Sequence, residues 1–171
     1  MDGKTTSYLD ITALPAVGET LLDARAAVVF AADGTHLLYA NAAGATLIDA
    51  RGMGDALKVR FSNLNPLTAQ MARLSRLLPS DTARMEMLRF GQGVSVTTLA
   101  AACRRLNLAD GSRAVLAVAM AGSAGGSLGA RAELLVDAIA ANDCLAAVVT
   151  AEGKVVAGSD GPFDRGTRRG H

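Results

Sequence analysis

The residues best suited to nucleophilic or metal chemistry are two histidines, His36 and His171, and two cysteines, Cys103 and Cys144. A covalent catalyst needs a nucleophile beside a base, and a structural zinc site needs closely spaced pairs of ligands. The two cysteines lie far apart, and neither has a histidine neighbour. A segment of the form H-E-x-x-H is absent. The sequence therefore predicts no catalytic and no metal-binding residue, and we expect His36 to face solvent.

Four glycines within residues 122–129 lie between a predicted strand and a predicted helix, where phosphate-binding loops are found. Their spacing differs from the G-x-G-x-x-G of dinucleotide-binding loops. A P-loop needs Lys followed by Ser or Thr, and Ala130-Arg131 occupies that place. We therefore expect a linker over 122–129.

Three arginines, Arg104, Arg105 and Arg113, flank a predicted hairpin and suggest an anion or nucleic-acid site. Neighbouring strand residues point to opposite faces, so Arg104 and Arg105 do not share a surface, and no aromatic platform accompanies them. The net charge of +1 gives no attraction to nucleic acid or to an anionic membrane. We expect these arginines to protect a sheet edge, and we expect no nucleic-acid and no membrane partner for this segment.

The composition is that of a folded chain, because half of the 171 residues are hydrophobic and the charges nearly balance. That length accommodates one domain of common size with additional elements. No apolar run reaches the roughly 18–20 residues of a membrane-spanning helix, and the N-terminal sequence MDGKTTSYLD has no signal-peptide pattern. Cysteines without a disulfide pattern are typical of a reducing compartment. These features favour a cytoplasmic location.

The most informative stretch, residues 26–44, predicts a hairpin followed by a helix. An apolar run rich in β-formers leads to Asp33-Gly34, which favours a two-residue turn because glycine adopts positive φ. Asp110-Gly111 predicts a second turn of this kind. We therefore interpret Asp33 and Asp110 as turn residues.

The second strand of this hairpin alternates, which places Leu37 and Tyr39 on one face and His36 and Leu38 on the other. Asn41 comes next, where its side chain can accept hydrogen bonds from the first free amides of a helix.

The segment VVFAADGTHLLYANAAG, residues 28–44, resembles the opening of a PAS sensor domain. It is especially similar to PAS domains in alphaproteobacterial sensor histidine kinases of the PleC, DivJ and PdhS type. The resemblance implies an α+β fold with a five-stranded antiparallel sheet and short helices on one face. It also implies a sensory and dimerising module of a two-component system, with a role in cell-cycle or polarity control.

Some members of this family hold haem or flavin. Between Asn41 and Ser80 the chain has no His or Cys to ligate haem, and Cys103-Arg104-Arg105 is only part of a flavin-binding run. We expect no cofactor, although a small apolar metabolite between the helix at 66–78 and the sheet stays an alternative to a filled core.

The remaining pattern matches this order of elements. We expect helices at 14–25, 41–49, 56–61 and 66–78, then strands at 83–90, 94–106 and 113–120. A parallel α/β fold would alternate strand and helix throughout, so the order favours α+β. A GAF-like fold is the second choice.

A partial internal repeat follows a predicted amphipathic helix at 130–141. LLDA at 21–24 corresponds to LVDA at 135–138, and AAVVFAADG at 26–34 corresponds to AAVVTAEG at 146–153. The repeat predicts a second hairpin that begins another PAS-like unit.

These observations predict a lead-in and amphipathic helix at 1–20, a PAS domain at 21–121, a linker and helix at 122–141, the start of a second unit at 142–160 and a disordered tail at 161–171. Residues 14–25 pack either within the chain or on a second copy.

The resemblance implies a homodimer through the N-terminal helix and the sheet face, contacts with other kinase domains, and a response regulator as partner of the parent protein. The parent would be a phosphotransferase, whereas we expect no catalysis in this segment. A ligand-binding sensor and a protein-docking module remain the alternatives.

Overall fold

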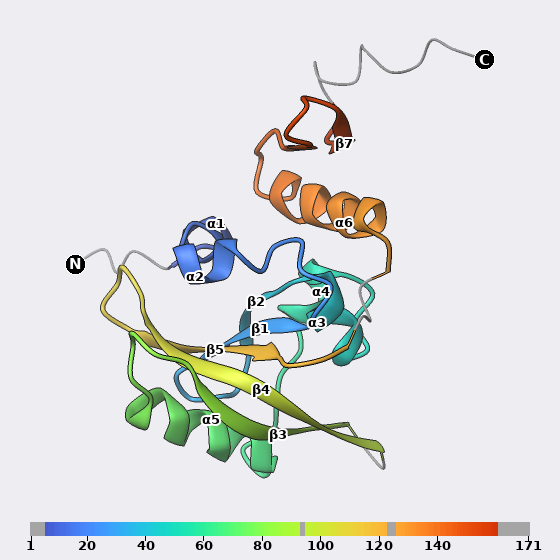
Figure 1. Ribbon diagram of the computed structural model, residues 1–171. Coiled ribbons are helices and arrows are strands. Elements are labelled where there is room, and N and C mark those ends of the chain that lie inside the picture. Colours follow the sequence, from blue (N-terminus) through green and yellow to red (C-terminus); the bar gives the residue numbers. More distant parts are fainter. Residues whose placement is uncertain (1–5, 93–94, 123–125, 161–171) are drawn as a thin grey trace.

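The computed structural model describes residues 6–92, 95–122 and 126–160. The strands are β1 (Ala27–Ala31), β2 (Leu37–Ala40), β3 (Arg84–Gln92), β4 (Ser95–Asn107), β5 (Arg113–Ala119), β6 (Ala147–Val149) and β7 (Val155–Gly158). The helices are α1 (Tyr8–Thr12), α2 (Pro15–Gly18), α3 (Ala42–Leu47), α4 (Met53–Ala56), α5 (Pro66–Leu77) and α6 (Leu128–Ala140). The first five strands form an antiparallel sheet in the order β2-β1-β5-β4-β3, and β6 pairs with β7 separately (Figure 1). The predicted α+β class and five-stranded antiparallel sheet are confirmed.

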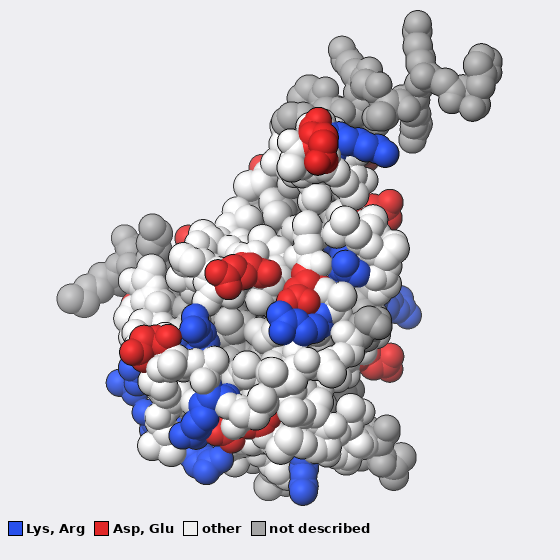
Figure 2. All heavy atoms as spheres, viewed as in Figure 1, with Lys and Arg blue, Asp and Glu red and all other residues white. Residues whose placement is uncertain are grey.

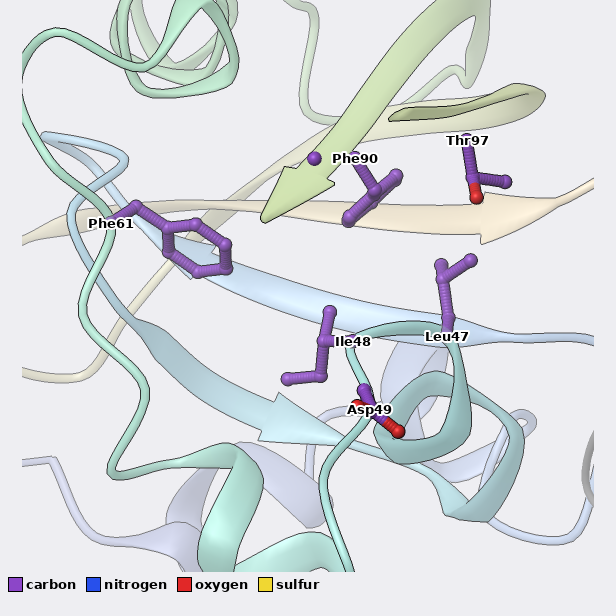
Figure 3. Close-up of a pocket in the computed structure, with 7 residues that line it drawn as sticks. Leu47, Ile48, Asp49, Phe61, Phe90 and Thr97 are labelled. Atoms are coloured by element: carbon purple, nitrogen blue, oxygen red, sulfur yellow. The ribbon is translucent and has the colours of Figure 1, made fainter. Parts of the chain in front are cut away.

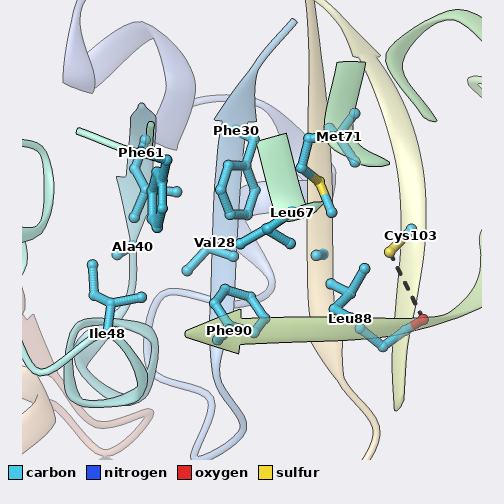
Figure 4. Close-up of a cluster of buried hydrophobic side chains, with 14 of the residues drawn as sticks. Val28, Phe30, Ala40, Ile48, Phe61, Leu67, Met71, Leu88, Phe90 and Cys103 are labelled. Carbon is cyan, nitrogen blue, oxygen red and sulfur yellow. Dashed lines mark hydrogen bonds between the residues drawn. The ribbon is translucent and has the colours of Figure 1, made fainter. Parts of the chain in front are cut away.

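Helices cover both faces of this sheet. On the inner face, α3, α4 and α5 enclose the main core, which Figure 4 shows around Phe30, Leu67 and Met71. On the outer face, α1 and α2 bury Ile11 and Val17 against side chains of β1, β2 and β5. The short helices between β2 and β3 therefore lie on one face, and the N-terminal helices take the other.

The N-terminal helices differ from the single helix predicted over 14–25, and that prediction is wrong. Pro15 has no amide hydrogen to bond inside a helix, so it begins α2 at the first position. α1 lies in the predicted lead-in and is capped by reciprocal bonds between Ser7 and Asp10. The apolar side of both helices packs within the chain, against the sheet.

A bulge in β2 overturns the predicted alternation of that strand. Val29 pairs with Tyr39 and Phe30 pairs with Leu37, so Leu38 is an extra residue. Leu37 consequently faces the inner core, whereas Tyr39 belongs to the outer cluster. The prediction that Leu37 and Tyr39 share a face is wrong because the bulge shifts the period of two by one residue.

The loop between β1 and β2 is longer than the predicted two-residue turn, because the Ala31 amide donates to the His36 carbonyl across residues 32–35. Gly34 does adopt the expected positive φ, +72°. A Cβ at this position would lie 2.5 Å from the Thr68 carbonyl oxygen. Glycine is therefore required both by the backbone conformation and by the contact with α5.

Asn41 is fully buried and joins separate backbone segments. Its side-chain oxygen accepts hydrogen bonds from the amides of Gly44 (2.8 Å), which caps α3 as predicted, and of Ala27 (3.0 Å) in β1. Its side-chain nitrogen donates to the carbonyls of Thr20 (3.0 Å) and Arg25 (2.9 Å). The chain after α2, the start of β1 and the start of α3 are thereby fixed together.

The middle of the chain mostly follows the predictions. α5 begins at Pro66 behind the cap Asn65, and the predicted strands at 83–90, 94–106 and 113–120 correspond to β3, β4 and β5. Gly91 and Gln92, expected in a loop, still pair with β4. The helix predicted at 56–61 is wrong, because α4 ends at Ala56 and the chain then follows the free edge of β2, where the Phe61 amide donates to the Thr35 carbonyl.

The C-terminal elements lie on the far side of α6 from the five-stranded sheet (Figure 1). α6 begins at Leu128, inside the predicted linker, because the Ser127 side chain accepts from the Ala130 amide. The expected second hairpin is present as β6 and β7. Residues 123–125 of the predicted linker and the predicted tail at 161–171 lie outside the described residues.

In the part of the chain that the structure describes, no helix combines the length and the apolar character needed to cross a membrane. On the face drawn in Figure 2, basic and acidic side chains are interspersed rather than gathered into one area of a single sign.

Replacing Asn41 by alanine is expected to destabilise the fold by about 3 kcal/mol, because several buried backbone groups lose their partners together. Asn65→Ala is the matched control, since Asn65 caps α5 at a half-buried position and its loss costs about 1 kcal/mol. Urea denaturation followed by circular dichroism measures both losses. Equal losses would contradict the structural role of the Asn41 bonds.

Candidate functional site

A cavity of about 260 Å³ lies between the end of α3 and the adjoining ends of β3 and β4 (Figure 3). Its described lining residues are Leu47, Ile48, Asp49, Phe61, Phe90, Gly91 and Thr97. In Figure 3 the side chains from the sheet and from the chain after α4 surround one side of the space, and those from α3 surround the other. This cavity is the candidate site.

The floor of the cavity is continuous with the inner core. Phe61 and Phe90 are buried, and both rings pack on Phe30, with ring centroids 5.5 and 6.2 Å from it. Tilted aromatic pairs at these separations are favourable. The two rings are therefore held in place before any ligand binds.

Asp49 supplies the charge of the site, since the other described lining residues are uncharged. It ends α3: its amide donates to the Thr46 carbonyl, and its φ is +58°. Glycine or asparagine usually occupies such a left-handed position after a helix. A solvent-exposed carboxylate is thus fixed beside an aromatic floor.

The cavity suits a ligand with an apolar body and a cationic group, and its volume is below that of typical drug-sized pockets. The described lining residues include no His or Cys that could ligate iron. Between α5 and the centre of the sheet the space is filled, because Leu67, Met71 and Leu74 are fully buried there. The cavity lies at the end of α3 instead.

A second surface of interest is the half of the outer sheet face that α1 and α2 leave bare. We call it the methionine patch: Met85 and Met87 on β3 and Met120 after β5, with 54, 58 and 45% of each residue exposed. Met85 pairs with Ala102 and Met87 with Ala100, and these small partners leave the surface flat. Exposed apolar side chains in one contiguous group mark interaction surfaces.

The residues examined for chemistry in the sequence lie apart from this cavity. The Asp33 carboxylate accepts from the amide and hydroxyl of Thr35, which lowers its pKa. Asp110 accepts from Ser112 in the same way, and its pKa is also lowered. His36 Nδ1 lies 3.0 Å from the Thr35 hydroxyl and 4.0 Å from Asp33. Both aspartates therefore act as loop residues.

The arginines lie near the end of β4 that extends beyond β3. Arg104 pairs with Leu116 and Arg105 with Val115, so the two side chains point to opposite faces of β4. The Arg105 amide donates to the Pro79 carbonyl where β3 no longer pairs. This arrangement is a local sheet edge, and it does not bring Arg104 and Arg105 into one anion site.

In comparisons with known proteins, no family model, no curated protein and no solved structure matches this chain.

No motif in the sequence marks the cavity as a whole. Leu47, Ile48 and Asp49 end one helix, whereas Phe90 and Thr97 lie on strands that follow much later in the chain. Asp49 alone has a local cause for its position, because its left-handed backbone follows from the end of α3.

The two cysteines are expected to differ in reactivity. Burial, together with the Glu86 carboxylate, raises the pKa of Cys103 to about 12, so its reactive thiolate is scarce at neutral pH. Cys144 is partly exposed. Native protein should react with one equivalent of a thiol reagent such as DTNB, and denatured protein with two. Fast reaction of a Cys144→Ser variant in its native state would contradict this.

Proposed function

We propose that this chain is a PAS-like sensory and dimerisation module of a sensor histidine kinase in a two-component system. The observation that carries the proposal is the sheet order β2-β1-β5-β4-β3, with α3, α4 and α5 between β2 and β3 on one face. The resemblance of residues 28–44 to PAS domains implies a five-stranded antiparallel sheet with short helices on one face, and this arrangement has both features. The assignment to a kinase, and a role in cell-cycle or polarity control, are supported by that resemblance alone.

A module of this kind acts by pairing and by passing a change in shape to the domains that follow it. α6 is placed for the second task, because it contacts α3 and α4 on one side and β7 on the other. Arg131 anchors it, since its Nε donates to the Leu22 carbonyl at 2.9 Å. A shift at the end of α3 would therefore reach α6 through direct packing.

Pairing is assigned to the methionine patch. The apolar sides of α1 and α2 pack against the sheet of the same chain. The β3–β4 half of the outer face is therefore free to contact a second copy. Burial of flexible methionine side chains in a symmetric contact would exclude water from both patches. The chain would then form a homodimer through the sheet face beside α1 and α2.

Met87→Lys is expected to weaken the homodimer about a hundredfold, because each of the two symmetry-related patches would bury an unpaired charge. Analytical ultracentrifugation over a range of protein concentrations measures this. Leu64→Lys is the control, since Leu64 is 93% exposed and lies outside the patch.

A monomer at all concentrations, or a dimer equally sensitive to Leu64→Lys and Met87→Lys, would overturn the pairing role. Circular dichroism of both variants establishes that the fold is retained.

Ligand sensing is the second candidate function, favoured by the carboxylate and aromatic rings of the cavity. The ligand class is a small amine with an apolar body, whose cation would meet Asp49 while its body packs on Phe61 and Phe90. Binding there would act on the end of α3, and α3 packs directly against α6.

We expect phenethylamine to raise the melting temperature of the protein, and its neutral analogue phenethyl alcohol to raise it less. Asp49→Asn should remove the difference between the two compounds. The control Asp55→Asn should keep it, because Asp55 is a carboxylate on α4 outside the lining. No stabilisation by either compound would contradict the ligand assignment.

A further inference from the structure

The hairpin β6–β7 repeats the hydrogen bonding of the hairpin β1–β2. The Asn41 amide donates to the Ala27 carbonyl, and the Ala27 amide donates to the Asn41 side chain. In the second hairpin the Ser159 amide donates to the Ala146 carbonyl, and the Ala146 amide donates to the Ser159 hydroxyl. Ser159 therefore occupies the place of Asn41, and Ala146 occupies that of Ala27.

The second hairpin also repeats the bulge. Val148 pairs with Ala157 and Val149 with Val155, so Val156 is extra in β7 as Leu38 is in β2. The structural correspondence is shifted by one residue from the sequence repeat, since Val148 corresponds to Val29.

The helix that covers each hairpin lies on the same face. Val29 and Tyr39 pack under α1 and α2, and their counterparts Val148 and Ala157 pack against α6. α6 therefore covers the same face of the second hairpin that α1 and α2 cover on the first.

The two hairpins differ in what covers their other sides. β1 pairs with β5 along its second edge, whereas β6 has a partner strand on one side only among the described residues. Phe30 and Leu37 are buried in the core under α5. Their counterparts Val149 and Val155 are 51 and 39% exposed.

The backbone groups at the open edge of β6 belong to Ala147 and Val149. Ala146 and Thr150 direct their groups toward β7, and successive residues of a strand direct them to opposite sides. The segment LAAVVT at 145–150 carries no charge to discourage strand pairing. In contrast, the edge strand β3 carries Arg84, Glu86 and Arg89.

Among the described residues, no strand stands in the place of β5 for this edge. β5 is already paired on both sides. The segment GPFDRGTRRGH at 161–171 has a proline, three arginines and one large apolar side chain, and lacks the apolar run of β5.

We propose that β6 is a strand-accepting edge that binds an antiparallel strand of β5-like chemistry from a partner polypeptide. That chemistry is the RAVLAVA of β5, which after its first arginine consists of alanine, valine and leucine. Such a partner strand adds main-chain hydrogen bonds to Ala147 and Val149. A partner that also brings an apolar helix, as α5 does in the first unit, would cover Val149 and Val155.

The β1–β5 pairing sets the expected register. Val29 lies opposite Leu116, Phe30 opposite Val115 and Ala27 opposite Val118. Transferred to the second hairpin, the partner strand places a leucine opposite Val148, which faces α6, and a valine opposite Val149.

The test uses the full chain and a labelled peptide with the sequence Ser112–Met120, flanked by two lysines at each end for solubility. Binding is followed by fluorescence anisotropy, and amide NMR shifts locate it. We expect saturable binding with the largest shifts at Ala147 and Val149. A scrambled peptide of equal composition is the reference.

Val149→Pro removes an outward amide without touching a bond to β7, and it should weaken peptide binding about tenfold or more. Val149→Thr keeps the amide and the branched shape, and it should bind like the unaltered chain. No saturable binding, or equal binding by the two variants, would overturn the proposal.

Self-association would give a distinct result. If the amides of Ala147 and Val149 are protected from hydrogen exchange without peptide, and lose protection on dilution, the edge binds a second copy and the proposal is wrong. Pairing through the methionine patch is distinguished by repeating the exchange measurement with Met87→Lys, because this substitution leaves the β6 edge unchanged.

Discussion

The arrangement of the chain depends on the hydrogen bonds made by the buried side-chain amide of Asn41. This amide fixes the segment at 20–25, which leads from α2 into β1, and so it determines where the N-terminal helices lie on the outer face. The same segment seats α6, because the Leu22 carbonyl accepts from Arg131. One residue type at the end of β2 therefore organises the cover of the sheet, the start of α3 and the placement of the C-terminal elements.

The lengths of the helices explain why the sheet is covered unevenly. At about 1.5 Å per residue, the twelve residues of α5 extend over about 18 Å, which is close to the width of five strands spaced about 4.8 Å apart. α1 and α2 have five and four residues, and they reach β2, β1, β5 and only the end of β4, at Leu106. The outer face of β3 and β4 is consequently left bare, and this is where the methionine patch lies.

The two hairpins show how much of a local structure is independent of its surroundings. The loop glycine at positive φ, the bulge in the second strand and the bond back to the first strand recur in both. The neighbouring strands differ between the two hairpins, because β1 is an interior strand whereas β6 is an edge strand among the described residues. Local sequence therefore determines the hairpin, and long-range contacts determine whether its edge and faces are buried.

Sequence patterns alone predicted the α+β class, the strands β3 to β5, the capped helix α5 and the capping role of Asn41. These features depend on residue periodicity and on short-range hydrogen bonds. Sequence patterns did not predict the division of the N-terminal helix or the bulge at Leu38, because one extra residue in a strand leaves the apolar pattern almost unchanged.

The cavity and the methionine patch, in contrast, follow from long-range packing. The cavity joins the end of α3 to strands that are distant in sequence, so no local pattern marks it. The methionines of β3 have the alternation of an ordinary buried strand, and they are exposed only because no helix reaches that half of the sheet. Burial depends on which elements meet across the whole fold, and that information is not contained in the spacing of residues along one element.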